Sequence, residues 1–433
     1  MSLSDIPGAV PEPGLVGPRQ GTALAEPTAR VRPLWTTGVV LVNLGINAAF
    51  FGPIQVLLGQ QAEHFDPGQK EAILALVTGA GAAVSLVANP LFGAFSDRTT
   101  SRFGRRVPWV LAGAILGAAA LICLAGAPNV AVMTLLWCLV QAGCNCAYAA
   151  ITAAVPDRVP VPQRATVGGL AAMGQTVGIL LGAVIAAVVS GNFALGYVVC
   201  AAALVAGVVM YLFKSDDAPL PAAARPALNW ADFLLSFIRP LRHPDFAWAW
   251  ITRLLVNIGN HMVTLYLLFF LADAVHLKET TGMEPAVGVL VLTGLYCVFV
   301  IITSVIGGRL SDRMGKRKPL VIASSAIIAA ASLILAFAPT WIGGIVGASV
   351  LGIGFGAYLA VDFALITQVL PSAGDRGKDL GVINIANSLP QVIAPVLAWP
   401  FVTLWGGYVS LYVAAAVIGL LGAVFVVKIK GVD

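Results

Sequence analysis

Charged residues are scarce in this sequence. Only 10% of its 433 residues are Asp, Glu, Lys or Arg, whereas 59% are hydrophobic and the mean hydropathy is +0.91. A soluble domain carries about 25% charged residues. Because so few charges cannot cover a water-soluble surface of this size, the composition predicts that lipid is the solvent and that this is a membrane protein.

Cysteine and histidine are also scarce, with six and four copies. Every cysteine lies inside an apolar stretch, so we expect small hydrophobic side chains rather than disulfides or metal ligands. The six are Cys123, Cys138, Cys144, Cys146, Cys200 and Cys297. The sequence also has no Ser/His/Asp set, metal cluster, ATP-binding motif or phosphate-binding glycine loop. We therefore expect neither an enzyme nor a bound cofactor.

Long apolar stretches make up most of the chain. A transmembrane helix needs about 20 such residues, and these stretches are too long to be barrel strands. Twelve transmembrane helices are predicted, at 34–60, 70–95, 108–126, 130–154, 166–190, 193–213, 246–272, 284–308, 319–338, 341–369, 379–404 and 407–427. Those at 108–126, 193–213, 319–338 and 407–427 have no ionisable residue in their cores, and we expect them to face lipid.

The basic residues lie almost entirely on one side of this topology. Both termini and the loops that follow even-numbered helices hold 22 of the 25 Lys and Arg. The opposite side has Lys70 and Lys278, and Arg253 lies inside a predicted helix. Positive residues beside membrane helices stay in the cytoplasm. We therefore predict a plasma-membrane protein with cytoplasmic termini, and the net charge of +5 needs no nucleic acid to explain it.

The two halves of the chain repeat one pattern. Asp97 in GAFSDRTTSRFGRR and Asp312 in GGRLSDRMGKRK lie 215 residues apart, each followed by a basic cluster and a proline. The predicted organisation is a disordered cytoplasmic tail (1–33), a six-helix bundle (34–213), a cytoplasmic linker (214–245), a second six-helix bundle (246–427) and a short tail (428–433). The fold class is therefore an all-α polytopic membrane protein with two pseudo-symmetric bundles. In duplicated transporters of this kind the substrate site lies at the repeat interface.

These two loops carry a family resemblance. They resemble the loop 2–3 and loop 8–9 signatures of the major facilitator superfamily. The longer first copy and GVINIANSLPQVIAP (381–395) are similar to plant sucrose transporters and to the glycoside–pentoside–hexuronide cation symporters. The resemblance implies a cytoplasmic gate that latches the two halves together, formed by Asp97, Arg98, Arg102, Gly104, Arg105, Arg106, Asp312, Arg313, Gly315, Lys316 and Arg317.

Both aspartates lie at the negative C-terminal end of a helix, which is unfavourable without positive partners. For Asp97 the candidates are the loop arginines and the N-terminus of the helix at 379–404. The alternative is that the arginines serve only as topology signals.

Polar residues mark one face on each of five predicted helices. Because such residues in a membrane face a bundle interior or a water-filled cavity, we expect them to line one central cavity. They are Asn43 and Asn47; Gln141, Asn145 and Tyr148; Arg253, Asn257, Asn260, His261 and Thr264; Tyr358 and Asp362; and Asn384, Asn387 and Gln391. The alternative for each amide is a hydrogen bond that only ties two helices together.

Arg253 and Asp362 are the two clear charges deep in apolar stretches. An intramembrane charge costs about 2.5–3.5 kcal/mol on insertion scales, so a functional role is the first expectation. A purely structural pair is the alternative. His261 lies two turns after Arg253 on the same face and is either a proton relay or a satisfied polar residue.

The predicted function is secondary active transport by alternating access. We favour proton-coupled symport of a sugar or similar small polar solute by a monomer, driven by a proton or cation gradient. Sucrose transporters carry an acid in their fourth helix where this chain has Gln141 and Asn145, so Asp362 becomes the candidate for coupling. The alternative is a proton-coupled exporter of drugs or metabolites. The stretch 166–190 lacks the Gly-Pro ending of such exporters, although Gly174, Gly178 and Gly182 predict close helix packing.

Overall fold

The computed structural model describes residues 27–189, 191–214, 217, 219–221, 240–314, 317–368 and 376–430. Within these ranges every regular element is a helix. The first six spans are α1 (Pro33–Gly52) with its continuation through η2 (Pro53–Leu57) and α2 (Leu58–Phe65), α3 (Lys70–Asp97), α4 (Val107–Ala125), α5 (Val130–Arg158), α6 (Val161–Val188) and α7 (Phe193–Lys214).

The second half repeats this arrangement after the short η4 (Pro240–Arg242). Its spans are α9 (Pro244–Leu265) with α10 (Leu267–Phe269) and η5 (Phe270–Ala274), then α12 (Pro285–Met314), α13 (Lys318–Phe337), α14 (Trp341–Gln368), α15 (Arg376–Thr403) and α16 (Gly407–Val426), with the short α11 (Leu277–Thr281) before α12. Each of the twelve predicted stretches is occupied by one of these spans, so the all-helical fold class is confirmed.

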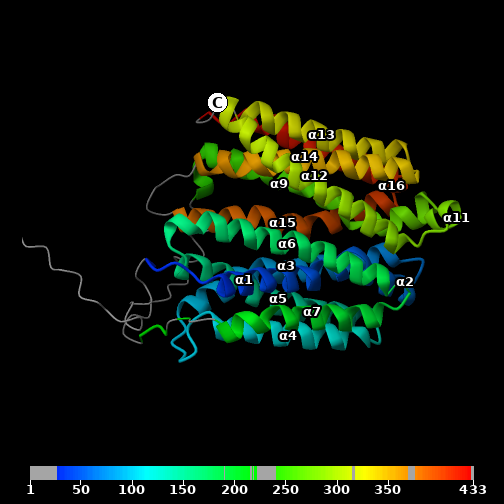
Figure 1. The fold of residues 1–433 in the computed structure, drawn as a ribbon. Coiled ribbons are helices and arrows are strands. Elements are labelled where there is room, and N and C mark those ends of the chain that lie inside the picture. The colour runs from blue at the N-terminus through cyan, green and yellow to red at the C-terminus, as the bar shows by residue number, and fades with distance from the viewer. Residues whose placement is uncertain are drawn as a thin grey trace, which may run out of the picture.

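Length and composition support the membrane assignment directly. Ten of the described helices are each long and apolar enough to cross a membrane, and α9 with its continuation forms a further span across a 41° bend. In α15 the described apolar segment, Ser388–Thr403, is shorter. The bend and both π-helical segments, η2 and η5, lie toward the same end of the bundle (Figure 1).

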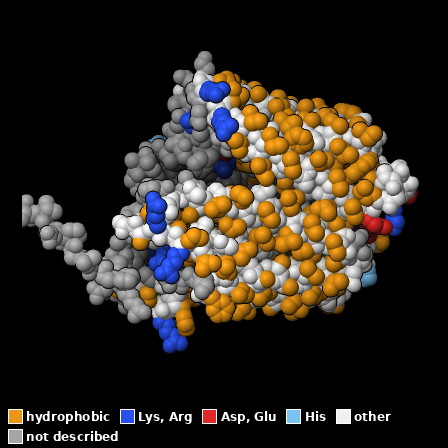
Figure 2. Space-filling model, viewed as in Figure 1, with side chains coloured by type: hydrophobic (Ala, Val, Ile, Leu, Met, Phe, Trp, Pro, Cys, Tyr) orange, Lys and Arg blue, Asp and Glu red, His pale blue; other side chains and the backbone are white. Residues whose placement is uncertain are grey.

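The two six-helix bundles lie side by side. Helices α1 and α3–α7 form one and α9 and α12–α16 the other, with α15 packed on α3 and α12 packed on α6 between them (Figure 1). We call the end that carries the loop at 98–106 the basic end, and the end that carries α2 and α11 the far end. Figure 2 shows lysines and arginines gathered at the basic end, where a hollow separates the bundles.

Glycine lets the helices approach closely where the sequence predicts it. A Cβ on Gly178 of α6 would overlap the carbonyl oxygen of Leu44 in α1, and one on Gly182 would overlap the amide of Gly52. Gly174 is equally close to the carbonyl of Val40. The predicted close packing along this face of α6 is therefore confirmed.

The outer surface is apolar, as a lipid-facing surface must be. Exposed side chains on the four helices predicted to face lipid include Leu111, Ile115, Ile122, Val198, Val205, Val209, Ile322, Leu333, Val417, Leu420 and Val424. Figure 2 shows hydrophobic side chains covering the whole length of the visible face between the two charged ends.

Candidate functional site

The two predicted intramembrane charges meet. Arg253 of α9 places Nη1 3.1 Å from Oδ2 of Asp362 in α14. Tyr358, one turn earlier in α14, donates its hydroxyl to Oδ1 of the same carboxylate at 2.8 Å. Each oxygen of Asp362 therefore has a partner, and Arg253 and Asp362 are only 8% and 3% exposed. A charge buried this deeply is stable only when it is paired in this way.

The polar face of α9 continues from this pair toward the far end. Asn257 donates Nδ2 to the carbonyl of Arg253, and Nδ1 of His261 lies 2.8 Å from the carbonyl of Asn257. A carbonyl can only accept, so Nδ1 of His261 carries a proton and Nε2 is the nitrogen left for another partner. On the predicted face, the side chains of Asn257 and His261 are thus each bonded to a backbone carbonyl one turn earlier in α9.

A row of aromatic rings adjoins the charged pair. Tyr296 of α12 and Phe355 of α14 stack with their centroids 6.1 Å apart, and Phe355 lies the same distance from Tyr358. Tyr296 also reaches Asn260 of α9, with its hydroxyl 3.5 Å from Oδ1. Trp248 packs instead on Phe425, and Trp399 is 38% exposed.

The first bundle contributes uncharged amides. Gln175 of α6 donates Nε2 to Oδ1 of Asn43 in α1 at 3.2 Å and to the hydroxyl of Tyr148 in α5 at 3.3 Å. Asn43 and Asn47 are buried in α1, and Asn47 donates to the carbonyl of Asn43. Our sequence reasoning missed Gln175, although a single amide within the apolar stretch 166–190 is a usable signal.

A second amide group lies between α3 and α5. Asn145 donates Nδ2 to the carbonyl of Gln141 at 2.8 Å, and Asn89 of α3 donates to Oδ1 of Asn145 at 3.3 Å. Asn89 was also missed, because it directly precedes Pro90 near the end of its stretch. These bonds join neighbouring helices, so they fit the alternative of interhelical hydrogen bonding as well as a binding role.

Part of the predicted cavity lies outside the described residues. The side chains of Asn384 and Asn387 on α15 belong to this part, whereas Gln391 on the same helix is half-buried. The polar residues described above therefore come from α1, α3, α5 and α6 of one bundle and α9, α12, α14 and α15 of the other.

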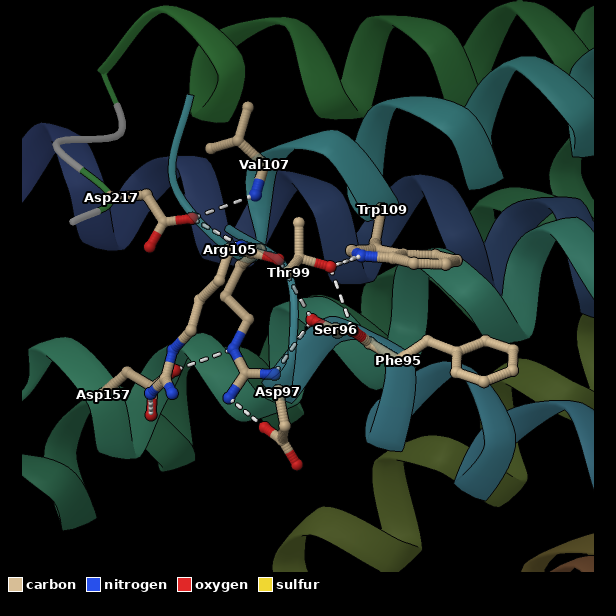
Figure 3. Close-up of polar contacts among 10 residues, drawn as sticks. Phe95, Ser96, Asp97, Thr99, Arg105, Val107, Trp109, Asp157 and Asp217 are labelled. Carbon is tan, nitrogen blue, oxygen red and sulfur yellow. Dashed lines mark hydrogen bonds and ion pairs between the residues drawn. The ribbon is translucent and has the colours of Figure 1, made fainter. Parts of the chain in front are cut away.

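The loop at the basic end forms an ion network. Arg106 donates to Asp97 at 2.6 Å and to Asp157, at the end of α5, at 2.7 Å, while Arg105 lies 2.6 Å from Asp157 (Figure 3). Arg106 also donates to the hydroxyl of Ser96. The predicted positive partner of Asp97 is thus Arg106, and these contacts tie α3, α4 and α5 of the same bundle together.

Asp217, which follows α7 in the sequence, also contacts this loop. Its carboxylate accepts the backbone N–H of Arg106 and of Val107, and so caps the N-terminus of α4 (Figure 3). Burial raises the pKa of Asp217, and the two N–H donors and the nearby Arg106 oppose that effect. Gly104 has φ +90°, and a Cβ there would overlap the Asp217 carboxylate. Glycine is therefore required at 104 by both backbone and space.

The remaining gate residues are less constrained. Arg98 caps α3, and the exposed Arg102 lies over the ring of Phe103 at 4.8 Å. In the second copy, Arg313 is exposed near the end of α12 and Arg317 caps α13. The side chain of Asp312, and Gly315 and Lys316, lie outside the described residues. That these loops latch the two bundles remains a prediction.

Two six-helix bundles around a polar interior define a solute carrier of the membrane. The family model of the Major Facilitator Superfamily matches residues 39–295 and 274–432. The chain belongs to this superfamily, and it is accordingly a multi-pass membrane transporter rather than an enzyme. Sequence comparison finds "Putative transporter YoaB" of Bacillus subtilis (strain 168), 27% identical over 177 residues, which are 39% of this chain and 41% of that relative.

Solved structures share the fold at low identity. The nucleoside transporter NupG is 14% identical with a TM-score of 0.72, covering 92% of this chain and 100% of that one. A peptide transporter in complex with sulfate is 15% identical with a TM-score of 0.73, covering 94% and 96%. A bacterial homologue of the human lysosomal transporter Spinster, in an inward-facing and unoccupied conformation, is 15% identical with a TM-score of 0.67, covering 92% and 95%.

Proposed function

We propose that this protein is a secondary active transporter that moves a sugar or a similar small polar solute together with a proton. The observation that carries the proposal is the buried contact between Arg253 and Asp362. The charged pair lies on the inner helices α9 and α14. Placing two charges in the membrane costs several kcal/mol of insertion free energy, which a role in joining two helices would not require.

The pair supplies a mechanism for coupling. Burial in lipid-like surroundings favours the protonated carboxyl, whereas an adjacent arginine favours the carboxylate. If Arg253 lies beside Asp362 in one conformation and withdraws in the other, proton binding depends on which side the site faces. Alternating access then converts a proton gradient into solute movement, because each state binds the proton with a different affinity.

The first bundle suggests the chemistry of the solute. Its described polar side chains on these helices include uncharged amides and a hydroxyl, which offer both donors and acceptors: Asn43, Asn47, Asn89, Gln141, Asn145, Tyr148 and Gln175. A neutral, hydroxyl-rich molecule fits such groups best. The resemblance to sucrose transporters and to glycoside–pentoside–hexuronide symporters supports the same class, and two of the similar structures are transporters of other polar solutes, nucleosides and peptides.

We further propose that the basic end is cytoplasmic and that the membrane is the plasma membrane. The charge bias supports this orientation. The tails 1–33 and 428–433 and the linker 214–245 then lie in the cytoplasm, and the hollow in Figure 2 opens inward.

Cysteine labelling tests this orientation. In a background without the six native cysteines, Gln69→Cys should react with an impermeant maleimide added to intact cells, because Gln69 is exposed at the far end. Thr100→Cys, exposed at the basic end, should react only after the membrane is permeabilised. Labelling of both positions from outside would contradict the proposed topology.

Uptake into proteoliposomes tests the function itself. The purified protein is reconstituted, an acidic exterior is imposed, and a panel of radiolabelled sugars and lipophilic cations is offered. We expect one or more neutral sugars to accumulate only while the pH gradient lasts. This accumulation should be lost when a protonophore is added. Gradient-driven extrusion of lipophilic cations, with no sugar accumulation, would instead support the exporter alternative.

A further inference from the structure

The far end holds an ion pair between the two bundles that the sequence analysis did not anticipate. Lys70, the first residue of α3, places Nζ 2.8 Å from Oδ1 of Asp273 in η5. Lys70 is only 7% exposed, and its ammonium also lies 4.9 Å from the ring centroid of Phe269. Lys70 belongs to the first bundle, whereas Asp273 and Phe269 belong to the second, so these contacts hold the bundles together at this end.

Neighbouring contacts close the same end. Tyr266, at the bend between α9 and α10, donates its hydroxyl to the backbone carbonyl of Glu71 at 3.3 Å. A Cβ on Gly59 of α2 would lie 2.9 Å from Cδ2 of Leu268, so the backbone of the first bundle presses directly on a side chain of the second. The far end is therefore shut while Figure 2 shows a hollow between the bundles at the basic end.

Each partner of the ion pair also has a second partner within its own bundle. Lys70 lies 3.3 Å from Oε1 of Glu63 in α2, and Asp273 accepts a hydrogen bond from the hydroxyl of Tyr408 in α16 at 2.9 Å. When the bundles separate, Lys70 keeps Glu63 and Asp273 keeps Tyr408. Neither charge is left without a partner, which removes much of the cost that breaking a half-buried ion pair would otherwise carry.

The backbone is irregular in both bundles at this place. The π-helical segments η2 and η5 interrupt the first span of each bundle at its far end, and η2 lies against α9, α10 and α12 of the other bundle. Such segments are rare and are often found at functional sites.

We propose that the contact between Lys70 and Asp273 is a reversible lock that stabilises the conformation closed at the far end. When that end opens, the one contact across the bundles is lost and the two contacts inside the bundles remain. This inference rests on the proposed alternating access. In it, Lys70 and Asp273 set the equilibrium between the conformation closed at the far end and the conformation open there.

Spin-label distances test the lock. Labels at Gln69→Cys and Glu279→Cys, exposed positions on opposite bundles at the far end, report its opening by pulsed electron resonance on the purified full chain. Lys70→Gln and Asp273→Asn should each raise the population at long distance by about fivefold, a value between those of exposed and buried ion pairs. The double variant should open the far end no further than either single variant, because both remove the same contact.

Lys278→Gln is the matched control. Lys278 lies 2.7 Å from Glu284 at the same end of the molecule, but both residues belong to one bundle. The substitution removes the same charge as Lys70→Gln does. It should leave the distance distribution unchanged. Distances in the Lys70 and Asp273 variants that equal those of this control, or effects that add in the double variant, would overturn the lock.

A second measurement separates this outcome from failure of the proposed function. Solute uptake by the wild-type protein is measured separately, so normal wild-type uptake together with unchanged distances in the variants contradicts the lock and leaves the proposed function standing. If Lys70→Gln does not purify as a folded protein, Asp273→Asn tests the same contact, because Asp273 is the more exposed of the two partners.

Discussion

Asp362→Asn is expected to abolish solute accumulation driven by a pH gradient while leaving exchange of solute across the membrane. Asparagine fills nearly the same volume and can still accept a hydrogen bond from the hydroxyl of Tyr358, although the buried Arg253 loses its counter-charge and some stability should be lost with it. The asparagine side chain can neither bind nor release a proton, and it carries no negative charge to attract Arg253. Uptake into proteoliposomes, with and without an imposed gradient, measures accumulation, and counterflow of labelled solute measures exchange.

Two further variants sharpen this result. Tyr358→Phe removes one hydrogen bond, worth about 0.5–1.5 kcal/mol, but keeps the carboxyl and the arginine, so accumulation should continue. Arg253→Gln leaves the buried carboxyl of Asp362 without its counter-charge. We expect that carboxyl to stay protonated, so this variant should uncouple transport as Asp362→Asn does. If Asp362→Asn still concentrates solute from a pH gradient alone, the pair is structural and the coupling assignment is wrong.

Much of the architecture could be predicted because membrane insertion leaves few choices. Twelve apolar stretches give twelve helical spans, since only helices and closed barrels satisfy the backbone in lipid. The pairing of Arg253 with Asp362 could be predicted for a similar reason. Two opposite charges in the interior of one bundle have no other way to avoid a large desolvation cost.

The rest depended on contacts that pattern alone does not encode. The partner of Arg106 at Asp157 and the cap supplied by Asp217 come from segments about 50 and 110 residues away in sequence. Lys70 is the first residue of α3 and Asp273 lies in η5, 203 residues later, and each looks like an ordinary residue at a helix end. A single amide such as Gln175 shows no periodicity and is a signal only by its presence in an apolar stretch, and Asn89 directly precedes Pro90 near the end of its stretch.

Arg106→Ala is expected to destabilise the fold by about 3 kcal/mol, the cost of removing one member of a buried ion pair. The side chain of Arg106 is 3% exposed and joins Asp97 to Asp157, so its loss leaves Asp157, with a side chain 18% exposed, beside Arg105 alone. Thermal unfolding of the protein in detergent, followed by intrinsic fluorescence, measures the change. Arg106→Lys should recover only part of the stability, since an ammonium cannot reach both carboxylates as the guanidinium does.

Arg102→Ala is the matched control, because it removes the same charge from the same loop. Arg102 is exposed and its described contact is with the ring of Phe103, so its replacement should change stability by less than about 0.5 kcal/mol. Both variants reduce the positive charge of the loop equally, and any effect on membrane topology should therefore be the same in both. A large loss with Arg106→Ala alone would show that this arginine holds α3, α4 and α5 together. Equal, small losses in the two variants would instead mean that the arginines of this loop act only as topology signals.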